Sequence, residues 1–106
     1  RLRIGASVHS LAEAVAAEKA GADWIVFGPV FDTPSKRAWG PPQGLEALAR
    51  VTAAVRVPVL AIGGITPERV RAVRGAGAHG VAVISAILGA DEPAAATRRF
   101  LAALAA

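Results

Sequence analysis

Four short runs of apolar, largely β-branched residues recur along the chain, and none of them alternates cleanly between apolar and polar positions. They lie near residues 3–6, 24–27, 58–62 and 81–84. Unbroken apolar runs of this length are typical of strands that are buried on both faces, as in parallel sheets. Helical patterns lie between and after these runs. The sequence therefore predicts an α/β fold with the order βαβαβαβα, in which parallel strands are joined by right-handed crossovers.

Capping residues mark where the helices begin and end. Ser10 and Glu13 form the pattern of a capping box, and the helix that they open is expected to stop at Gly21. Residues 45–52 have the apolar spacing of a second helix. Thr66 followed by a proline predicts the start of a third helix, which glycines at 75–77 end, and residues 91–93 open the last one.

An internal repeat gives the length of one βα unit. The tripeptide Ala-Gly-Ala precedes the second apolar run at residues 20–22 and the fourth at residues 76–78. Two βα units thus span 56 residues, so one unit takes about 28 and eight would take roughly 224, the usual size of a (β/α)8 TIM barrel. Residues 1–106 are expected to form a single domain of four units, half of such a barrel. A four-stranded open α/β sheet is the structural alternative.

Composition excludes several classes of protein. Hydrophobic residues make up 54% of the 106 residues, too many for a disordered chain, and no apolar run is long enough to span a membrane. We therefore expect a soluble protein without a membrane partner. The sequence has no Cys, which fits a cytoplasmic location, and no Met, so we expect it to be a piece of a longer protein. The net charge of +4 comes from scattered residues, which argues against nucleic-acid binding.

Polar or glycine-rich residues follow all four apolar runs. In parallel α/β folds, ligands bind at the carboxyl ends of the strands, so these residues form a candidate rim. Gly63 and Gly64 follow the third run, where bare backbone N–H groups can approach an anion, and Ser85 follows the fourth, where barrels often place a short extra helix. A tight turn explains Gly63 and Gly64 equally well when they are taken alone. Together with Ser85, they predict a phosphate site shared by the last two loops.

The long connection from Gly28 to Gly44 is another candidate, because loops of this length in compact domains are usually functional or disordered. Its Thr33, Ser35 and Lys36 side chains suit a phosphate or diphosphate, although a solvated surface loop is the plain alternative. Asp32 is expected to cap the loop locally rather than to bind a metal. His9, on the first rim segment, is a candidate general base or a residue that orients its loop by hydrogen bonding. No carboxylate pair, metal-ligand cluster or nucleophile triad is evident.

The motifs of this rim resemble those of the thiamine phosphate synthase and TenI family. The resemblance rests on Ser-Val-His-Ser at 7–10, Gly-Pro-Val-Phe-Asp-Thr-Pro-Ser-Lys at 28–36, Ala-Ile-Gly-Gly-Ile at 61–65 and Gly-Val-Ala-Val-Ile-Ser-Ala at 80–86. It covers the whole chain, and it implies the carboxyl-terminal half of the family's (β/α)8 barrel, from the fifth strand onward.

The resemblance implies a transferase that joins hydroxymethylpyrimidine diphosphate to thiazole phosphate, both small phosphorylated molecules, and releases pyrophosphate through a pyrimidine cation. Ser7 matches the serine near the reacting pyrimidine and the pyrophosphate, and Lys36 would stabilise the leaving group together with Mg²⁺. Other positions match the family's substrate-binding residues. Thr33, Ser35 and Lys36 match its Thr-x-Thr-Lys group, with Ser in place of the second Thr, and Gly63, Gly64 and Ser85 match its cradle for the thiazole phosphate, with Val83 and Ile84 beside it.

The TenI branch of the same family isomerises a thiazole carboxylate phosphate with a histidine in the loop after the second of these strands. That position is Pro29 here, which lowers this alternative without excluding it. The family's Mg²⁺-binding aspartates and the basic residues for the pyrimidine diphosphate lie on the first half of the barrel. We therefore expect the 106 residues alone to bind thiazole phosphate weakly and to catalyse nothing. A non-catalytic phosphate-binding half barrel that pairs with itself as a homo-oligomer, or with a partner, is the second hypothesis.

Overall fold

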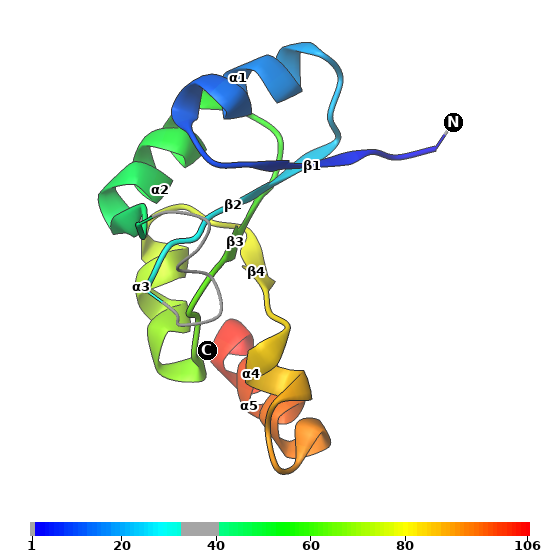
Figure 1. The fold of residues 1–106 in the computed structure, drawn as a ribbon, viewed down its shortest axis with the longest axis vertical. Helices are drawn as coiled ribbons and strands as arrows, with labels where there is room; N and C mark the ends of the chain where they lie inside the picture. The colour runs from blue at the N-terminus through cyan, green and yellow to red at the C-terminus, as the bar shows by residue number, and fades with distance from the viewer. Residues whose placement is uncertain (1, 33–40) are drawn as a thin grey trace.

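The computed structural model describes residues 2–32 and 41–106, and these form one four-stranded sheet with helices between the strands (Figure 1). The strands are β1 (Gly5–Val8), β2 (Trp24–Phe27), β3 (Val59–Ile62) and β4 (Gly80–Ala82). They are all parallel and lie in the order β1-β2-β3-β4, so neighbours in the chain are neighbours in the sheet. This is the arrangement of half a (β/α)8 barrel, as the repeat predicts.

Helices follow the strands in the predicted order. They are α1 (Leu11–Lys19), α2 (Gly44–Ala54), the 3-10 turn η2 (Pro67–Arg69), α3 (Val70–Gly75), α4 (Ser85–Leu88) and α5 (Pro93–Ala105). The first three α-helices lie side by side against the sheet, and α5 packs against both α3 and α4 (Figure 1). Within the described ranges, no helix is long and apolar enough to cross a bilayer.

The predicted cap of α1 is present, with one change. The Ser10 hydroxyl accepts a hydrogen bond from the Glu13 N–H at 3.1 Å, as a capping box requires. The Glu13 carboxylate reaches back one residue further than expected, because it accepts from the N–H of His9 at 2.8 Å rather than from that of Ser10. Thr66 lies at the start of η2 as predicted, but its side chain makes no capping hydrogen bond.

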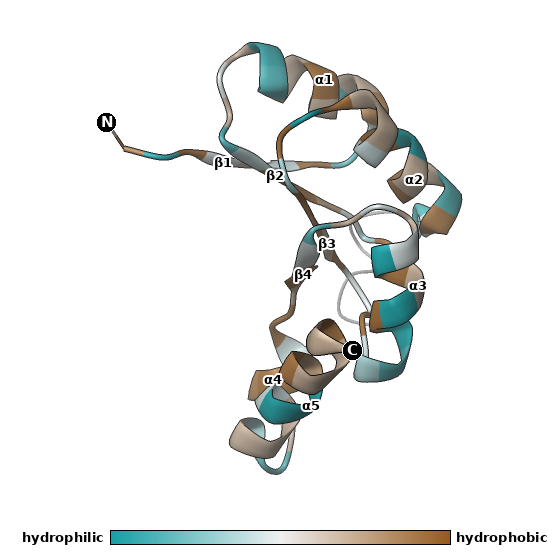
Figure 2. Cartoon of the chain, turned by 180° about the vertical axis from the view of Figure 1, so that it is seen from behind, coloured by the Kyte–Doolittle hydropathy of each residue, from teal (hydrophilic) through white to brown (hydrophobic). Residues whose placement is uncertain are grey.

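The core lies between the sheet and its helices, on one face of the strands. Ile25 and Phe27 of β2 are fully buried there, and they lie in register with Val59 and Ala61 of β3. The core also contains Leu48, Val51, Val70 and Val73 from the covering helices. In Figure 2 the strand β3 is brown along its length, which reflects the continuous apolar run that predicted it.

The opposite face of the sheet corrects one prediction. Trp24 and Val26 of β2, and Leu60 and Ile62 of β3, alternate with the buried residues and are only half-buried. The expectation of strands buried on both faces is therefore wrong for this chain. The reason is that the described helices cover one face of the sheet, while nothing in residues 2–32 and 41–106 covers the other face, which would point to the axis of a barrel.

Two strand boundaries also differ from those read off the sequence. The first strand runs over Gly5–Val8 rather than residues 3–6, and Ile4 is 61% exposed. The last strand ends at Ala82, so Val83 and Ile84 follow it rather than belong to it. Pairing with the neighbouring strand sets these limits, because β1 extends as far as its register with β2 from Gly5 to Val8. Apolar character alone does not show where pairing stops.

A carboxylate bridge ties α1 to the segment before β3. Glu18 Oε2 accepts hydrogen bonds from the backbone N–H groups of Arg56 at 2.6 Å and Val57 at 3.1 Å. A charged acceptor on two backbone donors is stronger than a neutral one. We expect Glu18→Gln to lower the free energy of unfolding by about 1–2 kcal/mol, measured by urea denaturation. The matched change Glu46→Gln, at an exposed position 3.7 Å from Arg50, should stay within about 0.5 kcal/mol, and equal losses for the two variants would contradict the bridge.

Candidate functional site

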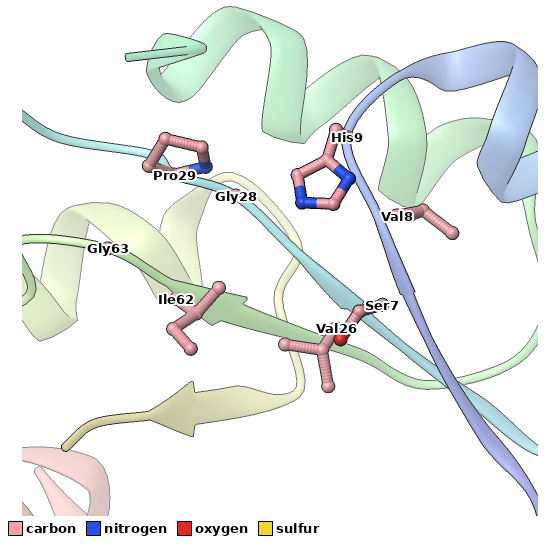
Figure 3. Close-up of a pocket in the computed structure, with 8 residues that line it drawn as sticks. All are labelled: Ser7, Val8, His9, Val26, Gly28, Pro29, Ile62 and Gly63. Atoms are coloured by element: carbon pink, nitrogen blue, oxygen red, sulfur yellow. The ribbon is translucent and has the colours of Figure 1, made fainter. Parts of the chain in front are cut away.

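A cavity of about 260 Å³ lies at the carboxyl ends of the first three strands (Figure 3). It brings together residues from three separate rim segments, as the parallel order predicts. Its lining consists of Ser7, Val8, His9, Val26, Gly28, Pro29, Ile62 and Gly63. Ser7 and Gly63, which the sequence placed in different subsites, therefore share one pocket.

Ser7 and His9 reach this pocket because residues two apart in an extended chain point to the same side. Ser7 belongs to β1 itself, opposite Val26 in the register, rather than to the loop after the strand as the sequence suggested. His9 follows the strand by one residue. Figure 3 shows its imidazole ring near Pro29 and Gly28.

Glu13 binds the backbone of the His9 segment. Its Oε1 accepts a hydrogen bond from the His9 backbone N–H at 2.8 Å and lies 3.6 Å from the imidazole Nδ1, beyond hydrogen-bond distance. That the His9 side chain orients this loop by hydrogen bonding stays a prediction. Proton transfer by His9 stays a prediction.

Gly63 and Gly64 form a turn that other residues would not fit. Their φ angles are +104° and +63°, in the region that favours glycine. A Cβ on Gly63 would lie 2.6 Å from the Cα of Pro29, and one on Gly64 would lie 2.8 Å from the carbonyl oxygen of Asp32. Within the described part of the chain, no group accepts a hydrogen bond from the N–H of Gly64 or of Ile65. Exposed N–H groups in a glycine turn can bind an anion closely.

The loop after β2 is bound to the glycine turn through its backbone. Val30 donates to the carbonyl of Ile62 at 2.9 Å, and Phe31 donates to that of Gly63 at 3.0 Å. At the far end of the same loop, Gln43 donates to the carbonyl of Pro29 at 2.7 Å, and Gly44 donates to that of Val30 at 2.9 Å. Two neighbouring rim segments therefore hold each other in place.

The close packing of Gly28 and the contacts of Arg69 at this junction were not predicted from the sequence. Gly28 lacks room for a side chain, because a Cβ there would collide with the carbonyl oxygen of Ile62. Arg69 donates from Nη1 to the carbonyl of Gly64 at 2.6 Å, and its guanidinium carbon lies 4.6 Å from the centre of the Phe31 ring. Arg69 is exposed, as a charged residue on a helix usually is. Its position five residues after Gly64, on the first turn of a helix, was the available signal.

The remaining predicted site residues lie elsewhere. Ser85 begins the short helix α4, as predicted, but it does not line the cavity. Val83 packs against the core, whereas Ile84 is 58% exposed. The predicted residues Thr33, Ser35 and Lys36 lie outside the described part of the chain.

The Mg²⁺ that the family resemblance implies finds no donor set in the described residues. No three His, Asp or Glu side chains gather in residues 2–32 and 41–106. Asp32 is the one carboxylate of the rim segment after β2, and a Mg²⁺ site usually needs further oxygen donors. The described part of this chain therefore does not fit a magnesium site.

Comparison with known proteins shows which family the chain resembles. A family model described as thiamine monophosphate synthase matches residues 1–87. The chain is 52% identical over 101 residues to a thiamine-phosphate synthase of Salinibacter ruber, with 95% of this chain and 44% of that protein covered. It is 49% identical over 102 residues to a thiamine-phosphate synthase of Roseiflexus sp., with 96% and 43% covered. The chain thus spans less than half the length of these two relatives.

Solved structures show the same likeness. A thiamine phosphate pyrophosphorylase from Pyrococcus furiosus superposes with a TM-score of 0.89 at 43% identity, over 98% of this chain and 49% of that one. A 3-hexulose-6-phosphate synthase superposes with a TM-score of 0.72 at 27% identity, over 96% and 49%. In both cases four βα units match about half of a longer chain.

Proposed function

This chain belongs to the thiamine monophosphate synthase family, and on that premise we propose that residues 1–106 supply the thiazole phosphate site of a thiamine phosphate synthase. They would form the carboxyl-terminal half of its barrel. The enzyme would join hydroxymethylpyrimidine diphosphate to thiazole phosphate and release pyrophosphate.

The observation that carries this proposal is the glycine turn beside the Ser7 pocket. The turn presents the N–H groups of Gly64 and Ile65 without an acceptor among the described residues, and it lies next to a cavity large enough for a small substrate. A phosphate held by the turn would place the attached thiazole at this cavity. Holding two reactants in one orientation supplies much of the rate enhancement of such a reaction.

The proposed reaction breaks one bond and forms another. The C–O bond between the pyrimidine methylene carbon and the diphosphate breaks, and the electron pair leaves with pyrophosphate. The thiazole nitrogen then donates its lone pair to the resulting cation to form the new C–N bond. Ser7 would contact the pyrimidine and the leaving group, while Thr33, Ser35 and Lys36 would bind the pyrophosphate, where a positive charge stabilises the developing negative charge. Gly63, Gly64 and Ser85 would hold the thiazole phosphate, with Val83 and Ile84 beside it.

The tautomerase alternative is less favoured by this pocket. Pro29, at the position where the TenI branch has a histidine, lines the cavity and carries no proton. We therefore place the chain with the synthases rather than with the tautomerases.

A comparison of two proteins tests the proposal. We expect a longer protein that contains these 106 residues together with a first half-barrel to form thiamine phosphate from the two substrates, measured by chromatography of the product. The 106 residues alone should bind thiazole phosphate weakly and show no turnover, because the half that binds the diphosphate is absent. Turnover by the isolated 106 residues would contradict the proposal that a first half-barrel is needed to bind the diphosphate. A longer protein that isomerises the thiazole carboxylate phosphate but forms no thiamine phosphate would overturn the synthase proposal.

A further inference from the structure

Arg69 contacts both the glycine turn after β3 and the loop after β2, although the proposed reaction gives it no role. It ends η2, and its guanidinium contacts both the Gly64 carbonyl and the Phe31 ring. One contact is to the turn after β3, and the other is to the loop after β2. The side chain therefore connects the candidate phosphate site to the loop that carries Thr33, Ser35 and Lys36 in the sequence.

The contact with Gly64 has a geometric consequence for the turn. A trans peptide unit is planar, with its C=O and N–H bonds pointing in opposite directions. When Arg69 holds the Gly64 oxygen at 2.6 Å, it also fixes the direction of the Ile65 N–H in the same peptide unit. That N–H is one of the two without an acceptor among the described residues. An oriented donor binds an anion better than one that must first reorganise.

The guanidinium is also held by a second contact. Its carbon lies 4.6 Å from the centre of the Phe31 ring, a cation–π contact that restricts the side chain and helps to keep its donor on the Gly64 oxygen. Glu68 directly precedes Arg69 in the sequence, and both side chains are exposed.

We propose that Arg69 is a positioning residue of the phosphate site, which holds the Gly64–Ile65 peptide in the orientation that directs its N–H toward a bound phosphate monoester. This inference rests on the proposed function, because it assigns Arg69 to the site that would hold the thiazole phosphate.

Substitutions in the longer enzyme test the hydrogen bond from Arg69 to the Gly64 carbonyl. Arg69→Met removes both the hydrogen bond and the charge, and it is expected to raise the KM for thiazole phosphate about tenfold. The kcat should stay within about twofold, because Arg69 does not reach the atoms that react. Arg69→Gln keeps an N–H donor for Gly64 on a shorter side chain, so its KM should fall between those of the wild type and Arg69→Met. Arg69→Lys should restore part of the loss.

Arg71 provides the matched control, because it lies two residues further on, exposed on α3. Arg71→Met changes the net charge equally and should leave both constants unchanged. Calorimetric titration with thiazole phosphate gives the affinity directly, and circular dichroism shows whether each variant is folded.

The outcomes distinguish this inference from the function on which it rests. A wild-type enzyme that neither binds thiazole phosphate nor forms product overturns the proposed function. An active wild-type enzyme whose Arg69→Met variant equals Arg71→Met overturns the role of Arg69 and leaves the function in place. A loss in kcat with an unchanged KM also overturns it, as does a gain in thiazole phosphate affinity in Arg69→Gln.

Discussion

Replacing Gly63 with alanine is expected to lower the free energy of unfolding by about 2–4 kcal/mol and to abolish detectable binding of thiazole phosphate at the proposed site. Two effects add. The φ of +104° is unfavourable for an alanine, and the new Cβ would lie 2.6 Å from the backbone of Pro29. Pro29 cannot move away freely, because its carbonyl accepts from Gln43 and the next residue is bonded to Ile62. Urea denaturation and calorimetric titration measure the two losses.

Gly75 gives the matched control for this substitution. It lies in α3, its φ is not positive, and a Cβ there would meet nothing within 4 Å. Gly75→Ala should be neutral or should stabilise the protein by up to about 1 kcal/mol, because alanine favours a helix more than glycine does. If Gly63→Ala were as stable as Gly75→Ala, the turn would not need a glycine, and the proposed phosphate site would lose its main support.

Truncation of Phe27 is expected to have the largest effect on stability. Its side chain is fully buried in β2, between the sheet and its helices. Phe27→Ala should lower the free energy of unfolding by about 3–5 kcal/mol, the sum of lost apolar burial and the cavity left behind. This loss is a large fraction of the stability of an ordinary domain. Thermal and urea denaturation of the full-length enzyme measure it.

Leu101 is the control for Phe27, since it is apolar but 60% exposed on α5. Leu101→Ala should change the free energy of unfolding by less than about 0.5 kcal/mol. Losses of similar size at the two positions would show that the core is not where the structure places it. Because Phe27 directly precedes the Gly28 junction, the folded fraction of Phe27→Ala should also bind thiazole phosphate less tightly.

The existence, type and order of the elements could be predicted from the sequence, whereas strand limits could not. An apolar run such as 58–62 is expected to be buried, so it predicts that a strand is present. The first and last residues of the strand depend on its pairing with the adjacent strand. Ile4 is apolar but unpaired with β2, whereas Ser7 is polar and paired with Val26. The same applies to burial: Trp24 and Ile25 are both apolar, but only Ile25 faces the helices.

The candidate site divides in the same way. Ser7 and Gly63 could be predicted to lie at the same end of the sheet, because the carboxyl ends of parallel strands converge, a rule that needs only the order of the elements. Their contact with a substrate stays a prediction. Arg69 could not be predicted in this way, because its role depends on contacts with Gly64 and with Phe31, which lies 38 positions away in the sequence. Glu18 is similar, since its partners at Arg56 and Val57 lie on another element. Side chains that act across elements leave no periodic signal.

The two ends of the connection between β2 and α2 are hydrogen-bonded to each other, so its length can change without moving the sheet. Gln43 and Gly44 bond to Pro29 and Val30, so the chain leaves and re-enters the fold at one fixed place. Once the ends of a loop are held, doubling its length costs only about 0.6 kcal/mol in closure entropy. Insertions, deletions and new side chains between the two anchors can therefore accumulate in evolution at little cost to the sheet.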